Sequence, residues 1–169
     1  MVQNLNLMNR IIEANEMPET NSQIVFFGAG CFWHIEKIFH FTDGVLSTEV
    51  GYAGGTKSDP TYEEVCTGTT GHAEVVKVQF DENIISFDDL LNIFWDIHDP
   101  TQVNRQGFDI GSQYRSCVFT NNTSHKDTYN EQLDKLNKSM TYSKEIATIL
   151  YTDLVYYPAE EYHQKYLFR

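Results

Sequence analysis

The stretch Gly28-Ala29-Gly30-Cys31-Phe32-Trp33 decides how the chain around it folds. Directly before it, Ile24-Val25-Phe26-Phe27 is a short apolar run of the kind that forms a buried strand. After it, Ile35 and Phe39 recur at helical spacing with Cys31. The sequence therefore predicts a strand that passes through a tight glycine turn into a helix, with Cys31 at the turn.

Cys31 is a candidate nucleophile because of this position. A helix N-terminus offers free N–H groups and the positive end of the helix dipole, and both favour the thiolate. We therefore expect the pKa of the Cys31 thiol to be lowered. A buried structural cysteine is the alternative, since cysteine is among the residues most often found in protein cores. This stretch by itself does not choose between the two.

Composition limits the class of protein. A chain of 169 residues with 41% hydrophobic content suits one globular domain with its own core. The net charge of −12 argues against nucleic acid or an anionic membrane as the partner. Three cysteines without a C-x-x-C pair favour a reducing compartment. The N-terminus lacks the features of a signal peptide, so we expect a cytosolic protein.

The order of elements predicts the fold class. We expect residues 1–22 to form a polar N-terminal arm, with a short helix at 9–14, and residues 23–169 to form the catalytic domain. Further strands are expected at 46–52, 72–80, 113–119 and 146–151, and helices at 61–66, 86–98, 124–140 and 159–166. This order predicts a single α+β domain with a mixed sheet flanked by helices.

Local patterns refine some of these elements. Alternation in 46–52 places Leu46 on the buried face of its strand. Ser86 and Ser124 each stand three residues before an aspartate, the spacing of a capping box at a helix start. Cys117 is expected to be a packed core thiol that faces away from Tyr114, because the two have opposite parity in the strand 113–119.

Glu74 is the candidate acid. It shares one face of the strand 72–80 with Val76, Val78 and Phe80. A carboxylate is costly on an apolar face unless it is neutral or well hydrogen-bonded. Burial there would raise the pKa of Glu74 and make it a proton donor near neutral pH. Alternatively Glu74 reaches water from the end of the strand, and the sequence leaves both interpretations open.

Two long polar loops carry the remaining candidates. Loops of this length are usually functional. Tyr62 lies in the first loop, and Asp109 and Tyr114 close the second. Together with the aromatic pair Phe32 and Trp33, they suit a reaction at a polar centre that has an apolar group beside it.

Six motifs occur in order along nearly the whole chain, from about Val25 to Tyr166. They are Gly30-Cys31-Phe32-Trp33, Gly51-Tyr52-Ala53-Gly54-Gly55, Pro60-Thr61-Tyr62-Glu63-Glu64-Val65-Cys66, Gly71-His72-Ala73-Glu74, His98-Asp99-Pro100 and Gln113-Tyr114-Arg115-Ser116. In this order they resemble the A-type peptide-methionine sulfoxide reductases. The resemblance implies a ferredoxin-like α+β core and reduction of methionine S-sulfoxide, free or in proteins, without a metal or organic cofactor.

The resemblance also implies a role for each candidate. By resemblance, Cys31 is the nucleophile that becomes a sulfenic acid, and Glu74 is the proton donor to the sulfoxide oxygen. Tyr62 and Tyr114 would donate hydrogen bonds to that oxygen. Phe32 and Trp33 would form the pocket for the S-methyl group, and Asp109 would be a polar partner in the same site. Many members of the family carry a resolving cysteine in a glycine-rich C-terminal tail, which this sequence does not show. We therefore expect a one-cysteine cycle in which thioredoxin, glutaredoxin or a small thiol reduces the sulfenic acid.

Three alternatives stay open. Cys66 could resolve Cys31 through an internal disulfide. A cysteine–histidine acyl hydrolase would pair Cys31 with His72 or His98, although a hydrogen-bonded structural role is the better interpretation of His98. A redox sensor or sulfoxide-binding module would keep the pocket without turnover. A zinc site is less favoured, because Cys66 and His72 lack a second ligand pair.

Overall fold

The computed structural model describes residues 21–169 of the chain. Most of the expected N-terminal arm, including the helix expected at 9–14, lies outside the described residues. In the part described, no helix is long and apolar enough to cross a membrane.

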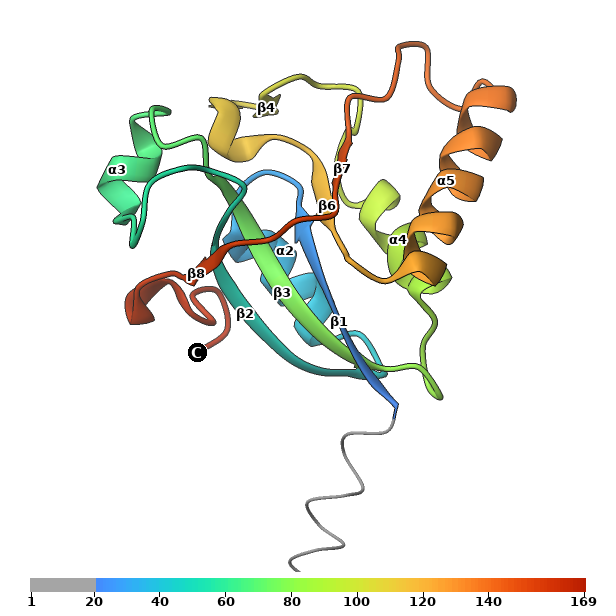
Figure 1. Ribbon diagram of the computed structural model, residues 1–169, viewed down its shortest axis with the longest axis horizontal. Coiled ribbons are helices and arrows are strands. Elements are labelled where there is room, and N and C mark those ends of the chain that lie inside the picture. Colours follow the sequence, from blue (N-terminus) through green and yellow to red (C-terminus); the bar gives the residue numbers. More distant parts are fainter. Residues whose placement is uncertain (1–20) are drawn as a thin grey trace, which may run out of the picture.

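The fold is built on one six-stranded sheet in the order β7-β6-β1-β3-β2-β8 (Figure 1). Its strands are β1 (Ser22–Gly28), β2 (Val45–Ala53), β3 (Ala73–Asp81), β6 (Cys117–Phe119), β7 (Ile149–Tyr151) and β8 (Tyr156–Pro158). Only β6 and β7 pair in parallel, so the sheet is mixed, as predicted. The central order β6-β1-β3-β2, with a helix after β1 and another after β3, is the ferredoxin-like arrangement.

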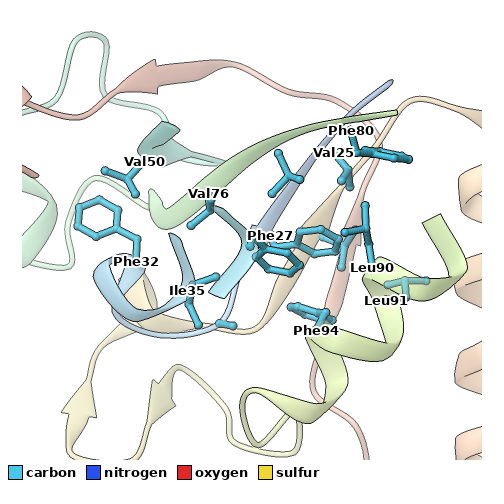
Figure 2. Packing of buried hydrophobic residues seen from close by; sticks show 14 of the residues in the cluster. Val25, Phe27, Phe32, Ile35, Val50, Val76, Phe80, Leu90, Leu91 and Phe94 are labelled. Carbon is cyan, nitrogen blue, oxygen red and sulfur yellow. The ribbon is translucent and has the colours of Figure 1, made fainter. Parts of the chain in front are cut away.

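Three longer helices are α2 (Phe32–His40), α4 (Phe87–Asp96) and α5 (Thr123–Lys138). The shorter elements are α3 (Tyr62–Cys66), the hairpin strands β4 (Arg105–Gln106) and β5 (Asp109–Ile110), and the 3₁₀ turns η1 (Ser112–Tyr114) and η2 (Glu161–His163). The main core lies between one face of the sheet and the helices α2 and α4 (Figure 2). There Phe27 of β1 stacks on Phe39 at 4.8 Å and on Phe94 at 5.2 Å.

The C-terminal part of the chain covers the opposite face of the sheet. The strands β7 and β8 lie at opposite edges, so the segment between them crosses the sheet (Figure 1). Its flanking tyrosines pack on that face: Tyr151 stacks on Phe119 at 4.5 Å, and Tyr156 lies 4.9 Å from Phe26. This crossing delivers the last residues of the chain to the side of β2, next to the start of α2.

Capping chemistry explains where three helices begin. The capping box expected at Ser86 and Asp89 is present at the start of α4, and Thr61 with Glu64 forms another at α3. The start predicted for α5 at Ser124 is wrong. The side chain of Asn122 accepts the N–H of His125, so the helix begins one residue before Ser124.

Two strand predictions need correction. Leu46 is exposed, because a bulge between Val45 and Ser47 shifts the register of β2. The strand predicted at 113–119 is confined to β6, because Tyr114 belongs to η1, where its N–H bonds to the carbonyl of Gly111. The parity argument about Cys117 therefore fails, although this cysteine is fully buried, as expected.

The C-terminal elements also differ from the predictions. The strand expected at 146–151 is reduced to β7, and the helix expected at 159–166 is only the turn η2. Pro158 belongs to β8 instead of starting a helix, and Lys165 has a φ of 55°, which a continuing helix does not allow. The side chains of this segment instead bond to other parts of the fold, as described below.

Candidate active site

Cys31 lies between β1 and α2, at the turn that the sequence predicted. Gly30 has a φ of 95°, and a Cβ at Gly28 would lie 2.5 Å from the sulfur of Cys117. Both glycines are therefore required, one by backbone conformation and one by close packing. Cys31 is the N-cap residue of α2 and is partly buried.

The pKa expected for Cys31 is wrong in direction. Burial raises the pKa of the thiol to about 11, and the negative charges of Glu74 and Asp109 add to the rise. The N–H groups of Trp33 and His34 do lower it, as a helix N-terminus should, but desolvation outweighs them. At neutral pH, Cys31 is therefore mostly in its thiol form.

The structure resolves the alternatives for Glu74 in favour of burial. Its side chain comes from the start of β3, is 2% exposed, and accepts the N–H of Phe32 at 3.2 Å. Burial raises its pKa to about 8, assisted by the charge of Asp109 and opposed by the Phe32 N–H. In the described part of the chain no cation forms an ion pair with it. Glu74 is therefore a mostly neutral carboxylic acid at pH 7, beside the helix end that carries Cys31.

The two candidate tyrosines lie near this acid. Tyr62 begins α3, and its backbone N–H donates to Glu160 at 3.0 Å. Burial is the main cause of a raised pKa at both Tyr62 and Tyr114, and the charge of Glu74 contributes to each. The pKa of Tyr114 is raised to about 12, with Cys31 among its contributors. Both hydroxyls therefore stay protonated and able to donate hydrogen bonds.

Asp109 is exposed, on the small hairpin formed by β4 and β5. Its charge nevertheless raises the pKa of Cys31, Glu74 and Tyr114, so it stands near all three. The hairpin packs against the turn that carries Cys31, since a Cβ at Gly30 would lie 2.9 Å from the Cβ of Gln106.

Arg115 joins the two long loops, a role that sequence reasoning missed. Its guanidinium donates to the carbonyl of Gly71 at 3.0 Å and to that of Ser112 at 2.8 Å. Gly71 leads into β3 and Glu74, while Ser112 begins the turn that carries Tyr114. The buried guanidinium thus fixes the acid and one tyrosine relative to each other.

Phe32 and Trp33 form an aromatic wall directly after Cys31 in the chain. Phe32 is almost fully buried, and Trp33 is half-buried. The indole N–H of Trp33 donates to Nδ1 of His163 at 3.0 Å, and Tyr166 stacks on the indole with centroids 3.9 Å apart. The structure thus brings every predicted site residue to the same end of the fold.

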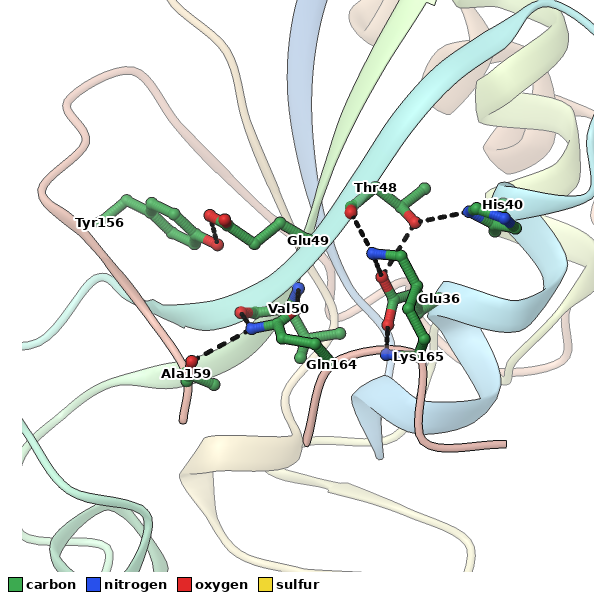
Figure 3. A network of polar contacts seen from close by, with 9 residues as sticks. All are labelled: Glu36, His40, Thr48, Glu49, Val50, Tyr156, Ala159, Gln164 and Lys165. Carbon is green, nitrogen blue, oxygen red and sulfur yellow. Dashed lines mark hydrogen bonds and ion pairs between the residues drawn. The ribbon is translucent and has the colours of Figure 1, made fainter. Parts of the chain in front are cut away.

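The C-terminal segment holds this wall in place. Figure 3 shows Lys165 bonded through its backbone N–H and its ammonium to the buried Glu36 of α2, and Gln164 bonded to both backbone groups of Val50. Glu160 accepts the hydroxyl of Tyr52 at 2.9 Å. Sequence reasoning missed these residues; the one available signal was the acidic Glu36 on the apolar stripe of its helix.

The remaining cysteines occupy different environments. Cys117 is fully buried, and desolvation raises its pKa to about 12. Cys66 is exposed and ends α3, which confirms the short helix expected at 61–66. The pKa of the Cys66 thiol is raised, mainly by burial. A hydrogen bond from the Tyr62 side chain lowers this pKa but does not cancel the rise.

The two histidines considered as bases are committed elsewhere. His72 accepts the N–H of Gly55 and bonds to the carbonyl of Lys57. His98 bonds to the carbonyl of Phe94 and the hydroxyl of Ser116, and burial lowers its pKa to about 4. Neither ring has a nitrogen free for Cys31, which argues against the acyl hydrolase. Residues 21–169 also contain no group of three or more potential metal-ligating side chains.

Comparisons with known proteins agree with this geometry. The family model for Peptide methionine sulfoxide reductase matches residues 23–169. The chain belongs to this family. A peptide methionine sulfoxide reductase MsrA of Methanothermobacter thermautotrophicus is 51% identical over 141 residues, which are 83% of each chain.

Solved structures support the same assignment. The reduced form of Mxr1 from Saccharomyces cerevisiae aligns with a TM-score of 0.78 and 34% identity, over 88% of this chain and 86% of that one. A structure of Mxr1 in complex with Trx2 aligns with a TM-score of 0.59 and 22% identity, over 88% and 86%, and supports the fold alone. The predicted family and fold class are confirmed, and the chain is an oxidoreductase of the peptide methionine sulfoxide reductase family.

Proposed function

We propose that this reductase converts methionine S-sulfoxide to methionine by attack of Cys31 on the sulfoxide sulfur, with Glu74 as the acid. The observation that carries this proposal is the environment of Glu74. It is buried beside the start of α2, its pKa is raised to about 8, and no cation of residues 21–169 forms an ion pair with it.

The chemistry requires such an acid. A sulfoxide sulfur becomes electrophilic when its oxygen is protonated or strongly hydrogen-bonded. Glu74 gives its proton to the oxygen, and the thiolate form of Cys31, a small fraction at neutral pH because its pKa is raised, forms a bond to the sulfoxide sulfur. The hydroxyl then passes from the methionine sulfur to the Cys31 sulfur as the bond between the two sulfurs breaks, which releases methionine and leaves Cys31 as a sulfenic acid. Glu74 regains its proton from solvent. The thiol and the sulfoxide together thus give a sulfenic acid and a thioether, and no outside electron is needed in this step.

The two sides of the site supply selectivity. Phe32 and Trp33 form an apolar wall suited to the S-methyl group, while Tyr62 and Tyr114 offer hydroxyls to the oxygen. Asp109 is a polar partner whose charge helps to keep Glu74 protonated. A sulfoxide has methyl and oxygen in fixed handedness around sulfur, so an apolar side and a donor side together favour the S form.

The sulfenic acid is then reduced by thiols. We propose a one-cysteine cycle with thioredoxin, glutaredoxin or a small thiol as reductant. Thioredoxin is placed first by analogy with Mxr1, whose reduced form is 34% identical to this chain and which has also been solved in complex with Trx2. Cys66 remains the alternative resolving cysteine, since it is exposed and adjoins Tyr62.

The remaining assignments are broader. We propose that both free and protein-bound sulfoxide are substrates, that the enzyme is cytosolic, and that neither nucleic acid nor membrane is a partner, in line with the net charge of −12. We assign the activity to residues 23–169.

A single-turnover assay tests the proposal. The reduced enzyme is mixed with methionine S-sulfoxide without reductant, and methionine, free thiols and intact mass are measured. One methionine, one thiol lost and a mass gain of one oxygen are expected. Two thiols lost with no gain in mass would replace the one-cysteine cycle by an internal disulfide, and absence of methionine would contradict the function itself.

A further inference from the structure

His163 touches both sides of the proposed sulfoxide pocket. Its Nδ1 accepts the indole N–H of Trp33 at 3.0 Å. Its ring centroid lies 5.2 Å from that of Phe32 and 4.5 Å from that of Tyr62. The imidazole therefore stands between the apolar wall and a tyrosine of the oxygen side, although nothing in the sequence distinguished it.

Its neighbours in the chain hold it in this place. Two residues later, Lys165 forms an ion pair with the buried Glu36 at 2.8 Å. Three residues earlier, Glu160 accepts bonds from the Tyr52 hydroxyl and the Tyr62 backbone. The turn η2 is thus fixed at both ends, to α2 on one side and to α3 and β2 on the other.

The protonation of His163 suits an acceptor. Because Nδ1 accepts a hydrogen bond, the proton of the neutral ring is on Nε2. Nε2 is buried and has no hydrogen-bond partner among residues 21–169. Desolvation lowers the pKa of His163, against the opposing charges of Glu160 and Glu63. A buried donor without a partner is unfavourable, and its retention calls for a reason.

We propose that His163 is a positioning residue that fixes the indole of Trp33, and with it the distance between the methyl wall and Tyr62. This inference rests on the proposed function. It means that the wall formed by Phe32 and Trp33 of α2 is held in place by a residue of η2. The apolar contact with the methyl group is present in both the bound substrate and the transition state. Loss of the support should therefore raise KM and leave kcat nearly unchanged.

Two matched substitutions test the proposal. In H163N the amide oxygen can take the place of Nδ1 and accept the indole N–H, whereas the longer side chain of H163Q places its polar atoms near Nε2. Steady-state rates are measured with a methionine S-sulfoxide peptide and dithiothreitol as reductant. We expect H163Q to raise KM about tenfold, with kcat within about twofold of wild type, and H163N to stay within about threefold in KM.

Controls separate positioning from stability. His125 is likewise buried and stacks on Phe87 at 4.4 Å, but away from the site, so H125Q should change thermal stability without changing KM. In a W33F background, where the donor is absent, H163Q should add no more than about a twofold change in KM.

The outcomes are distinct. Equal KM values for H163N and H163Q, or a full H163Q effect in the W33F background, would overturn the role of the hydrogen bond. A wild-type protein that forms no methionine would instead contradict the proposed function, whereas normal wild-type activity with equal KM values for H163N and H163Q would contradict only the role of His163.

Discussion

Two buried glutamates, Glu36 in the middle of α2 and Glu74 of β3 beside the start of that helix, show how the same side chain serves two purposes. Glu36 lies in the helix, 1% exposed, and bonds to the ammonium and backbone N–H of Lys165 and to the hydroxyl of Thr48 (Figure 3). Glu74 faces the start of the helix, 2% exposed, and accepts one backbone N–H, from Phe32.

The difference lies in compensation of charge. Around Glu36 the fold supplies a cation and further donors, so the carboxylate can hold the C-terminal segment to α2. Around Glu74 it supplies burial and the nearby negative charge of Asp109, which favour the neutral acid. Glu74, the proposed acid, has no ion-pair partner among residues 21–169, whereas Glu36 has Lys165. Variants at the two carboxyls and around them test that distinction.

The largest effect on activity is expected from substitution of Cys31, the proposed nucleophile that acts together with Glu74. C31S leaves both glutamates in place but replaces the thiol by a hydroxyl, a poor nucleophile toward sulfur. We expect methionine formation in a single turnover to fall at least about 1,000-fold. Retained activity would show that the neutral acid acts on some other nucleophile.

E74Q should have the next largest effect on activity. The amide keeps the size of the side chain but has no acidic proton to give to the sulfoxide oxygen. We expect the rate constant of the sulfoxide step to fall about 100-fold while KM changes little. An effect confined to KM, measured under single-turnover conditions at varied substrate, would make Glu74 a binding group only.

The pH dependence of kcat/KM tests whether the neutral form of Glu74 is needed for the reaction. Below pH 8 the neutral form of Glu74 is constant and the Cys31 thiolate increases with pH, so kcat/KM should rise. Between about 8 and about 11 the loss of neutral Glu74 offsets the gain in thiolate, and the profile should level off. In E74Q the rise should continue through pH 8, and an unchanged break at pH 8 would assign it to another group.

Stability should respond in opposite directions at the two glutamates. E36Q leaves Lys165 without its counter-charge, and we expect a loss of about 2 kcal/mol in the free energy of unfolding, since the ammonium still reaches water. Because the folded pKa of Glu74 is raised from 4.5 to about 8, unfolding becomes easier as pH rises through that window.

E74Q removes this pH dependence. Relative to wild type, its free energy of unfolding should therefore increase by about 4 kcal/mol between pH 4.5 and pH 8. Urea unfolding of both variants at the two pH values checks the contrast. Destabilisation of E74Q at pH 8 similar to that of E36Q would remove the distinction between the two carboxyls.

The smallest effect is expected at Tyr114. Y114F removes one of two proposed donors to the sulfoxide oxygen while Glu74 and Tyr62 remain. We expect about a tenfold fall in the rate of the sulfoxide step and unchanged stability. The same change at Tyr129, a tyrosine buried in the core, serves as the control and should leave the rate unaltered.

Local patterns predicted the parts of the site that neighbours in the sequence determine. The strand, glycine turn and helix around Cys31, the start of α4, and the ordered motifs were all readable, because each depends on a few adjacent residues. The protonation state of Cys31 was not, since its pKa reflects burial by other parts of the fold. Glu74 was identified as a candidate, but its burial required the three-dimensional structure.

The sequence predictions that failed have two physical causes: local irregularities of the backbone and contacts between distant parts of the chain. Leu46 is displaced by a bulge, and the turn at Tyr114 replaces a strand that alternation alone had favoured. The segment that carries His163 gains its structure from side-chain bonds to α2, α3 and β2, and not from its own helical pattern. Long-range polar contacts of this kind leave no periodic signal in the sequence.

The most direct test of the central claim is the protonation of Glu74 itself. Infrared difference spectra between wild type and E74Q, recorded from pH 5 to pH 10, isolate the stretching band of its carboxyl group. We predict a protonated carboxyl at pH 7 that ionises with a midpoint near 8. A carboxylate already ionised at pH 6 would contradict the account, because the buried acid would then have no proton to give.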